Sequence, residues 1–322
     1  MKKLLLTYSL SLLLVSAMAQ AVPADTSRFA EYRIKIEELN HTIQKFPTDA
    51  DGYIKRSFYK QKLNDYQGAI QDLNKVIELN PLDYIALTNR GNANDHLLDY
   101  SAAIADYTRA VTFNKEYKEA FFARGTDRYK LKQYKNAIED FNQCIKLDST
   151  KSEFYLLRAY TKSEMKQYKE AIADYTKVIS LNAKNAKAYN NRGMAKYYLN
   201  DIQGALKDMD AAIALDPNYA QAYSKRGQIK LVLENYKSAL SDLDQAIVLD
   251  KTSATAYHNR GSVKFNLQDY KGALADYNKA IAMDPKQADM YDNRAKVNHV
   301  LGNTEEENKD KAQAENLRNK AK

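Results

Sequence analysis

An arginine and an aspartate each recur along this sequence with a constant spacing of 34 residues. The arginines are Arg56, Arg90, Arg124, Arg158, Arg192, Arg226, Arg260 and Arg294. The aspartates are Asp72, Asp106, Asp140, Asp174, Asp208, Asp242, Asp276 and Asp310. Two series that stay in step over eight periods indicate an internal repeat. The chain is therefore predicted to be an array in which each repeat covers apolar surface of its neighbour.

The residues between these markers indicate what one repeat contains. An alanine precedes each of the first seven aspartates by three positions, at Ala69, Ala103, Ala137, Ala171, Ala205, Ala239 and Ala273. Around Ala137 the apolar residues fall at helical spacing, at Tyr134, Ile138, Phe141, Cys144 and Ile145. A second helical stripe lies upstream at Phe121, Gly125 and Leu131, and the polar pair Lys132 and Gln133 separates the two. Each repeat is therefore predicted to be a helix, a short turn and an antiparallel helix.

This pattern resembles the tetratricopeptide repeat. The resemblance is carried by Tyr189-Asn190-Asn191-Arg192-Gly193, by Ala205 and by Pro217, which match the aromatic, small, alanine and proline positions of that family. It implies an all-α fold, a right-handed superhelix of helix-turn-helix repeats (an α-solenoid). The sequence departs from the family where a tryptophan is usual, because Tyr, Phe or Leu87 stands there.

The repeat register sets the expected domain boundaries. Seven units occupy residues 50–287, at 50–83, 84–117, 118–151, 152–185, 186–219, 220–253 and 254–287. A degenerate eighth repeat and C-terminal cap occupy 288–322, where Glu307 stands in the alanine position. Residues 20–49 are expected to hold a linker and an N-terminal capping helix, because Ser27 to Phe46 has one apolar stripe.

Residues 1–19 have the pattern of a secretory signal peptide. Lys2 and Lys3 precede an apolar run from Leu4 to Val15, and Ala17-Met18-Ala19 has the small residues that signal peptidase accepts. The apolar run is shorter than the roughly 20 residues that a membrane-spanning helix needs. We therefore expect an exported protein, periplasmic in a bacterium or alternatively secreted, with no integral membrane segment in the mature chain.

Composition and motifs argue against catalysis and against nucleic-acid binding. The formal net charge of +8 comes from 49 basic and 41 acidic residues, which are interleaved and form no basic stripe. The four histidines lack metal-ligand spacing, and no phosphate-binding loop or hydrolase motif is present. The single cysteine, Cys144, occupies a core position. We expect no enzyme activity, no cofactor and no metal site.

The arginine and aspartate series is interpreted as structural ion pairs, because a catalytic set is not repeated along an array. The central pairs are Arg124 with Asp140, Arg158 with Asp174 and Arg192 with Asp208. Sequence leaves open whether these pairs form within a repeat or between repeats.

The resemblance implies that the first helices line a concave groove that holds the ligand. The positions that match this groove hold Phe122, Tyr129, Leu156, Tyr160, Met194, Tyr197 and Tyr198. Their alternative role is packing against the neighbouring first helix. Toward the C-terminus the groove positions become polar, at Gln221, Ser224, Lys225, Gln228, His258, Asn259, Asp292 and Asn293. Asparagine recurs at the same groove position in four units, at Asn89, Asn191, Asn259 and Asn293, where it can both donate to and accept from a peptide backbone.

These observations predict a non-catalytic scaffold of the cell envelope that binds an extended peptide or a partner protein in the concave groove. Lysine in the fifth and asparagine in the ninth position, the pair that chaperone-tail-binding members of the family use, do not occur together in this groove. The alternative prediction is a solenoid that binds carbohydrate or an envelope polymer on its tyrosines. The sequence does not indicate the oligomeric state.

Overall fold

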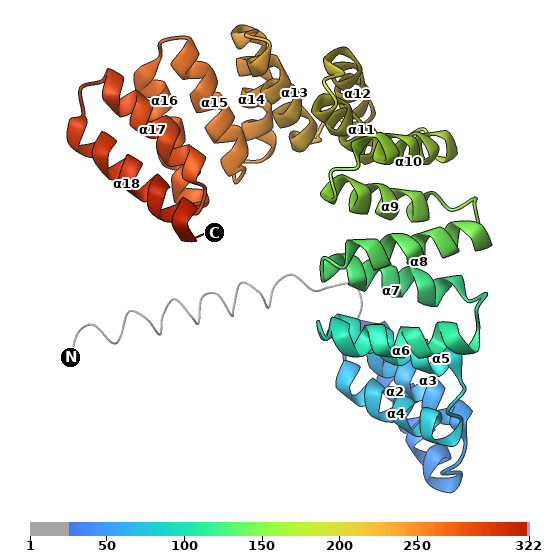
Figure 1. Cartoon of the computed structure of the whole chain (residues 1–322). Coiled ribbons are helices and arrows are strands. Elements are labelled where there is room, and N and C mark those ends of the chain that lie inside the picture. Colours follow the sequence, from blue (N-terminus) through green and yellow to red (C-terminus); the bar gives the residue numbers. More distant parts are fainter. Residues whose placement is uncertain (1–25, 321–322) are drawn as a thin grey trace, which may run out of the picture. The chain divides into compact units, whose positions relative to one another are not determined.

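The computed structural model describes residues 26–320, and every regular element in that range is an α-helix (Figure 1). The helices form two compact units, one ending at Asp148 and the other beginning at Ser149. The prediction of an all-α fold built from helical pairs is confirmed. The predicted signal peptide, residues 1–19, lies outside the described residues. Within residues 26–320 no helix combines the length and the apolar character needed to cross a membrane.

The first unit contains α2 followed by three helical pairs. Its helices are α2 (Thr26–Lys45), α3 (Ala50–Lys62), α4 (Tyr66–Leu79), α5 (Tyr84–His96), α6 (Tyr100–Phe113), α7 (Lys118–Lys130) and α8 (Tyr134–Leu147). In each pair the first helix packs on the second, and the second packs on the first helix of the next pair. The α5 and α7 helices, both first helices, also contact each other.

The second unit contains five helical pairs. Its helices are α9 (Ser152–Glu164), α10 (Tyr168–Leu181), α11 (Ala186–Tyr198), α12 (Ile202–Leu215), α13 (Ala220–Val232), α14 (Tyr236–Leu249), α15 (Ala254–Asn266), α16 (Tyr270–Met283), α17 (Ala288–Val300) and α18 (Thr304–Lys320). First helices again touch along the array, α11 with α13, α13 with α15 and α15 with α17. We call the surface formed by α9, α11, α13, α15 and α17 the first-helix surface of the second unit.

The alanine series lies at the centre of each pair. All seven alanines are fully buried, and the residue four positions later, such as Tyr107 or Met209, is at most 2% exposed. In five of the pairs a glycine on the first helix makes room for this packing, at Gly91, Gly125, Gly193, Gly227 and Gly261. A Cβ atom on Gly193 would lie 3.1 Å from the backbone oxygen of Ala205, and one on Gly91 would lie 2.5 Å from the ring of Tyr107. Close approach of the two helices therefore depends on small residues in both.

The turn inside each pair contains one residue in the left-handed region of backbone conformation. These residues are Asn64, Leu98, Lys132, Lys166, Asn200, Glu234, Gln268 and Gly302, with φ between 58° and 74°. Glycine adopts this conformation without steric cost, whereas the other seven residues are held there by the packing of the helices that they join. An aspartate often follows and caps the second helix, as Asp201 does by accepting the Gly204 amide at 2.9 Å.

Candidate functional site

Each aspartate of the repeat series is buried and pairs with the arginine of its own repeat. In the α11–α12 pair, Arg192 donates from Nε and Nη2 to the two oxygens of Asp208 at 2.9 and 2.7 Å. The Lys196 Nζ atom lies 2.8 Å from Asp208 Oδ2. The same two-pronged contact joins Arg124 to Asp140 and Arg158 to Asp174. These pairs therefore join the two helices of one repeat.

The remaining guanidinium nitrogen, Nη1, reaches the preceding repeat. Arg192 Nη1 donates to Thr176 Oγ1 at 3.2 Å, and Arg226 Nη1 donates to Asp210 Oδ1 at 2.6 Å. The acceptors found in the other repeats are Asn40, Asn74, Thr108, Asp244 and Asn278. One arginine thus contacts three helices. The arginines therefore form contacts both within their own repeat and with the preceding repeat.

Two of the predicted groove residues of the first unit pack against other aromatic rings. The half-buried Phe122 ring lies 6.1 Å from the ring of Phe141, and Tyr129 lies 5.8 Å from Tyr134. Asn89 lines a cavity of about 290 Å³ at the α3–α5 side of this unit. Phe122, Tyr129 and Asn89 belong to the first unit, whereas the other predicted groove residues belong to the second.

In the second unit most of the predicted aromatic residues also support the core. Leu156 and Tyr160 pack against Ala159, Ala171 and Tyr175. Burial raises the pKa of the Tyr160 hydroxyl, which lies beside Asn191. Met194 and Tyr197 pack against Ala205, Met209 and Ile229. Tyr198 is 56% exposed, and its ring stacks on that of Tyr168 with centroids 4.7 Å apart. The rings of Tyr197 and Tyr198 also contact each other, with centroids 5.7 Å apart.

The feature of this surface that sequence reasoning missed is a set of polar atoms without partners. Within the described residues, Asn190 Oδ1, Gln228 Oε1 and Asn259 Nδ2 are buried and form no hydrogen bond. They lie on α11, α13 and α15, three consecutive first helices. An unsatisfied buried polar atom costs roughly 1–3 kcal/mol, so a ligand that pairs with these atoms would recover that free energy. Gln228 and Asn259 belong to the predicted groove positions, whereas Asn190 does not.

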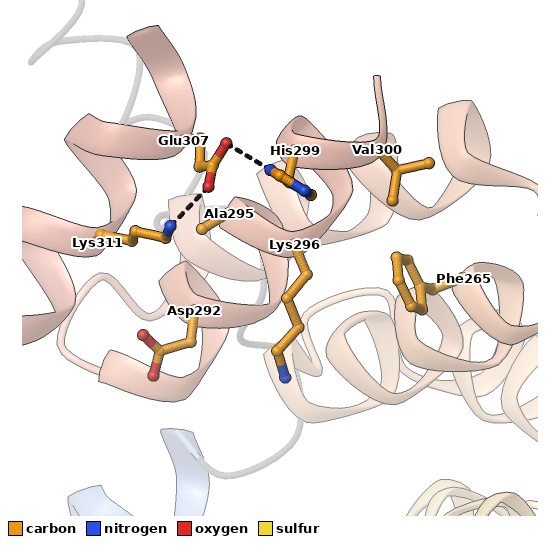
Figure 2. Close-up of a pocket in the computed structure, with 8 residues that line it drawn as sticks. All are labelled: Phe265, Asp292, Ala295, Lys296, His299, Val300, Glu307 and Lys311. Atoms are coloured by element: carbon orange, nitrogen blue, oxygen red, sulfur yellow. Dashed lines mark hydrogen bonds and ion pairs between the residues drawn. The ribbon is translucent and has the colours of Figure 1, made fainter. Parts of the chain in front are cut away.

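A cavity with a volume of about 570 Å³ lies at the last described repeat (Figure 2). Its lining residues are Phe265, Asp292, Ala295, Lys296, His299, Val300, Glu307 and Lys311. Glu307, which replaces the repeat alanine, accepts from Lys311 Nζ at 2.6 Å and contacts His299 Nδ1 at 3.0 Å. Both oxygens of the Glu307 carboxylate are therefore engaged by neighbouring side chains.

The described residues were predicted to hold no metal site and a buried, unreactive Cys144. Within 26–320, no group of three or more His, Cys, Asp or Glu side chains could hold a metal ion. Cys144 is fully buried, and burial raises the pKa of its thiol to about 12, so the thiolate form is suppressed at neutral pH. The unsatisfied polar atoms on α11, α13 and α15 are a separate feature, with no reactive group among them.

Comparison with profiles of known protein families identifies the type of repeat. Profiles described as tetratricopeptide repeat match residues 59–120, 119–151, 152–185 and 186–219, and one described as TPR repeat matches residues 261–302. No curated protein matches the sequence significantly.

Three solved structures illustrate the similarity of fold. A tetratricopeptide repeat protein from Parabacteroides merdae has 19% identity and a TM-score of 0.63, covering 77% of this chain and 98% of that one. YrrB, a TPR protein with an unusual peptide-binding site, has 23% identity and a TM-score of 0.53, covering 58% and 96%. The pilF protein of Pseudomonas aeruginosa has 15% identity and a TM-score of 0.56, covering 63% and 92%. At these identities the likeness concerns the fold.

Proposed function

We propose, from the premise that this chain is a tetratricopeptide-repeat protein, that it is a non-catalytic scaffold that binds an extended peptide segment of a partner protein. The binding site is the first-helix surface of the second unit. The observation that carries this proposal is the set of unsatisfied atoms on Asn190, Gln228 and Asn259. A fold of this kind is shared by proteins with different ligands, so the site and not the fold has to support the function.

An extended peptide is the ligand that fits these atoms. Asn190 Oδ1 and Gln228 Oε1 are acceptors, and Asn259 Nδ2 is a donor. A peptide backbone in extended conformation presents N–H donors and C=O acceptors along its length and can bind both kinds. Side-chain amides that are already buried lose little further conformational entropy on binding, which favours the bound state. The description of the similar protein YrrB as peptide-binding supports the same ligand class.

The cellular location that we propose is the cell envelope. Residues 1–19 have the composition of a secretory signal, and cleavage after Ala19 would release a chain that begins at Gln20. The partner would then be another exported or envelope protein. Cell fractionation of a tagged full-length chain tests this part independently, since recovery of the uncleaved protein in the cytoplasm would contradict it.

The peptide-binding part is tested with a random peptide library displayed on phage. Peptides selected on the protein are measured by fluorescence anisotropy against the variant N190L/Q228L/N259L, which keeps side-chain size but removes the polar atoms. We expect an affinity loss of about tenfold or more, since each lost hydrogen bond is worth roughly 0.5–1.5 kcal/mol. Gln203→Leu, an exposed change on α12, is the matched control and should leave affinity unchanged. Equal affinity for the triple variant would rule out this surface.

A further inference from the structure

The α17–α18 pair differs from the other helical pairs at the position four residues after the repeat alanine, which we call the core position. In the other pairs the core position holds an apolar side chain that is at most 2% exposed, at Leu73, Tyr107, Phe141, Tyr175, Met209, Leu243 and Tyr277. In the last pair it holds Lys311, whose side chain is 62% exposed and pairs with Glu307. The side chain that fills the centre of the other pairs is therefore replaced here by one that extends into solvent.

The preceding pair shows which residues surround a tyrosine in the core position. The ring of Tyr277 lies 5.6 Å from the ring of His258, measured between centroids, and its hydroxyl oxygen lies 2.9 Å from that of Ser262. A Cβ atom on Gly261 would lie 2.9 Å from the same ring, and Phe265 packs against its cluster. Four residues of α15 thus form the slot that Tyr277 fills.

The cavity of about 570 Å³ is the counterpart of this slot in the last pair (Figure 2). Glu307 and Lys311 line it and stand in the alanine and core positions of the repeat. Its lining also includes the residues 34 positions after each of the four slot residues, which are Asp292, Ala295, Lys296 and His299. The repeat therefore predicts what fits the cavity, because tyrosine fills the equivalent space in three other pairs.

The size and the mouth of the cavity suit one aromatic ring. An apolar cavity of about 150 Å³ is already large enough to hold benzene, so the volume here leaves room for a ring with substituents. The half-buried ring of Phe265 and the methyl group of Ala295 supply apolar contacts. Val300 and His299, which also line the cavity, are exposed, so a ligand can enter from solvent.

The carboxylates of the cavity are paired, which favours an uncharged ligand. Glu307 accepts from Lys311 at 2.6 Å and contacts His299 at 3.0 Å. Asp292 accepts from Arg318 of the same helical pair. A charged ligand would have to compete with these contacts, whereas a neutral ring leaves them in place.

Lys296 can bind a hydroxyl group on such a ring. Its ammonium group donates to Asn293 Oδ1 at 3.1 Å and has two further hydrogens to donate. Lys296 stands in the position of Ser262, the residue whose hydroxyl faces that of Tyr277 in the preceding pair. An ammonium group beside an aromatic face is also attracted to its π electrons.

We infer that the cavity between α17 and α18 binds an uncharged aromatic ring that carries a hydroxyl group, in the place that tyrosine takes in the α5–α6, α9–α10 and α15–α16 pairs. The site is separate from the unsatisfied amides of Asn190, Gln228 and Asn259, so the inference goes beyond the proposed function. The ring belongs either to a free phenol or to a tyrosine side chain of a partner, and the chemistry is the same for both.

The experiment follows the methyl group of Ala295 by NMR of the full chain with ¹³C-methyl-labelled alanine, and A295G assigns its resonance. The probes are p-cresol, toluene and N-acetyltyrosinamide. We expect a saturable shift of Ala295 with p-cresol and none of Ala171, and about threefold or more weaker binding of toluene, which lacks the hydroxyl. N-acetyltyrosinamide that binds as tightly as p-cresol identifies a tyrosine side chain as the source, and much weaker binding identifies a free phenol.

A cavity-filling variant tests whether the cavity is the tyrosine slot. E307A/K311Y introduces the alanine and the tyrosine of the preceding repeat, so that no carboxylate is left beside the new ring. We expect it to raise the melting temperature, because a ring becomes buried, and to weaken p-cresol binding at least tenfold. The matched control K309Y changes an exposed lysine of α18 that does not line the cavity, and it should leave p-cresol binding unchanged.

Three results would overturn the inference. The first is the absence of a saturable shift of Ala295 with any of the probes. The second is equal affinity for toluene and p-cresol, which would remove the hydroxyl group from the ligand. The third is p-cresol binding by E307A/K311Y with the affinity of the unchanged protein, or a lower melting temperature of this variant, because either would show that the cavity is not the tyrosine slot. Peptide binding by the first-helix surface is measured separately and does not depend on these results.

Discussion

The buried aspartates allow a quantitative prediction, because α12 carries one buried and one exposed aspartate and each pairs with an arginine. Asp208 is 3% exposed and holds both Arg192 and Lys196, which are 15% and 20% exposed. Asp210 is 63% exposed, and among residues 26–320 it pairs only with Arg226 of the next repeat. The changes D208N and D210N remove the same charge from the same helix. The difference between their effects on the free energy of unfolding therefore reports the contribution of burial and of the number of partners.

D208N is expected to lower the free energy of unfolding by about 2 kcal/mol or more beyond the effect of D210N. Removing one partner of a buried ion pair costs roughly 3–5 kcal/mol, since the remaining charge stays buried without compensation. Asparagine keeps one acceptor oxygen at position 208, so we expect D208N at the lower end, about 3 kcal/mol. For an exposed pair such as Asp210 with Arg226 the contribution is about 0–1 kcal/mol.

Both variants are compared by urea denaturation and by hydrogen exchange of α11 and α12. Hydrogen exchange is needed because a repeat array can open locally, and then one global free energy does not describe its unfolding. We expect D208N to accelerate exchange in α11 and α12 by roughly 100-fold, the equivalent of about 3 kcal/mol, and D210N by less than tenfold. Costs for the two variants that agree within about 0.5 kcal/mol would refute the reasoning.

Three further experiments test the core and its titratable groups. Ala171 is fully buried, so A171L should lower stability by about 1–3 kcal/mol in urea denaturation, and an unchanged midpoint would contradict the packing. Burial raises the pKa of Asp127 to about 6, so the folded state gains stability from its proton at low pH and loses it as the pH rises through about 6. D127N should therefore stabilise the protein more at pH 8 than at pH 4, and a pH-independent difference in melting temperature would argue against this. The Cys144 thiol should resist a thiol reagent at pH 8 until the chain is unfolded, and rapid reaction of the native protein would show that it is accessible.

The repeat and its helical pairs could be predicted from sequence because they recur. The pairing of Arg192 with Asp208 was predicted for the same reason, since both residue types are constant along the array. The second contact of the arginine was not predicted, because its acceptor changes from Thr176 to Asp210 in neighbouring repeats. The residue 16 positions before each arginine therefore keeps its role as hydrogen-bond acceptor, although its residue type differs between repeats.

The turn conformation was hidden from sequence for a related reason. Seven of the eight left-handed turn residues are not glycine, and Leu98 and Glu234 are residues that seldom adopt this conformation. The candidate site was found only in part. Asn259 and the polar character of the groove followed from the family resemblance, but the absence of a partner for Asn190 Oδ1 depends on side-chain contacts that the sequence does not specify.

The reach of each arginine has a consequence for how the array can change in length. Arg226 contacts residues 16 positions before and 16 positions after it, which together span slightly less than one period. Removal of residues 186–219 would place Thr176 16 positions before Arg226, and threonine already fills that role for Arg192. Deletion or duplication of a whole repeat thus keeps an acceptor such as Asn74, Thr176 or Asp244 within reach of the next arginine, so the length of the array can change without the loss of this contact.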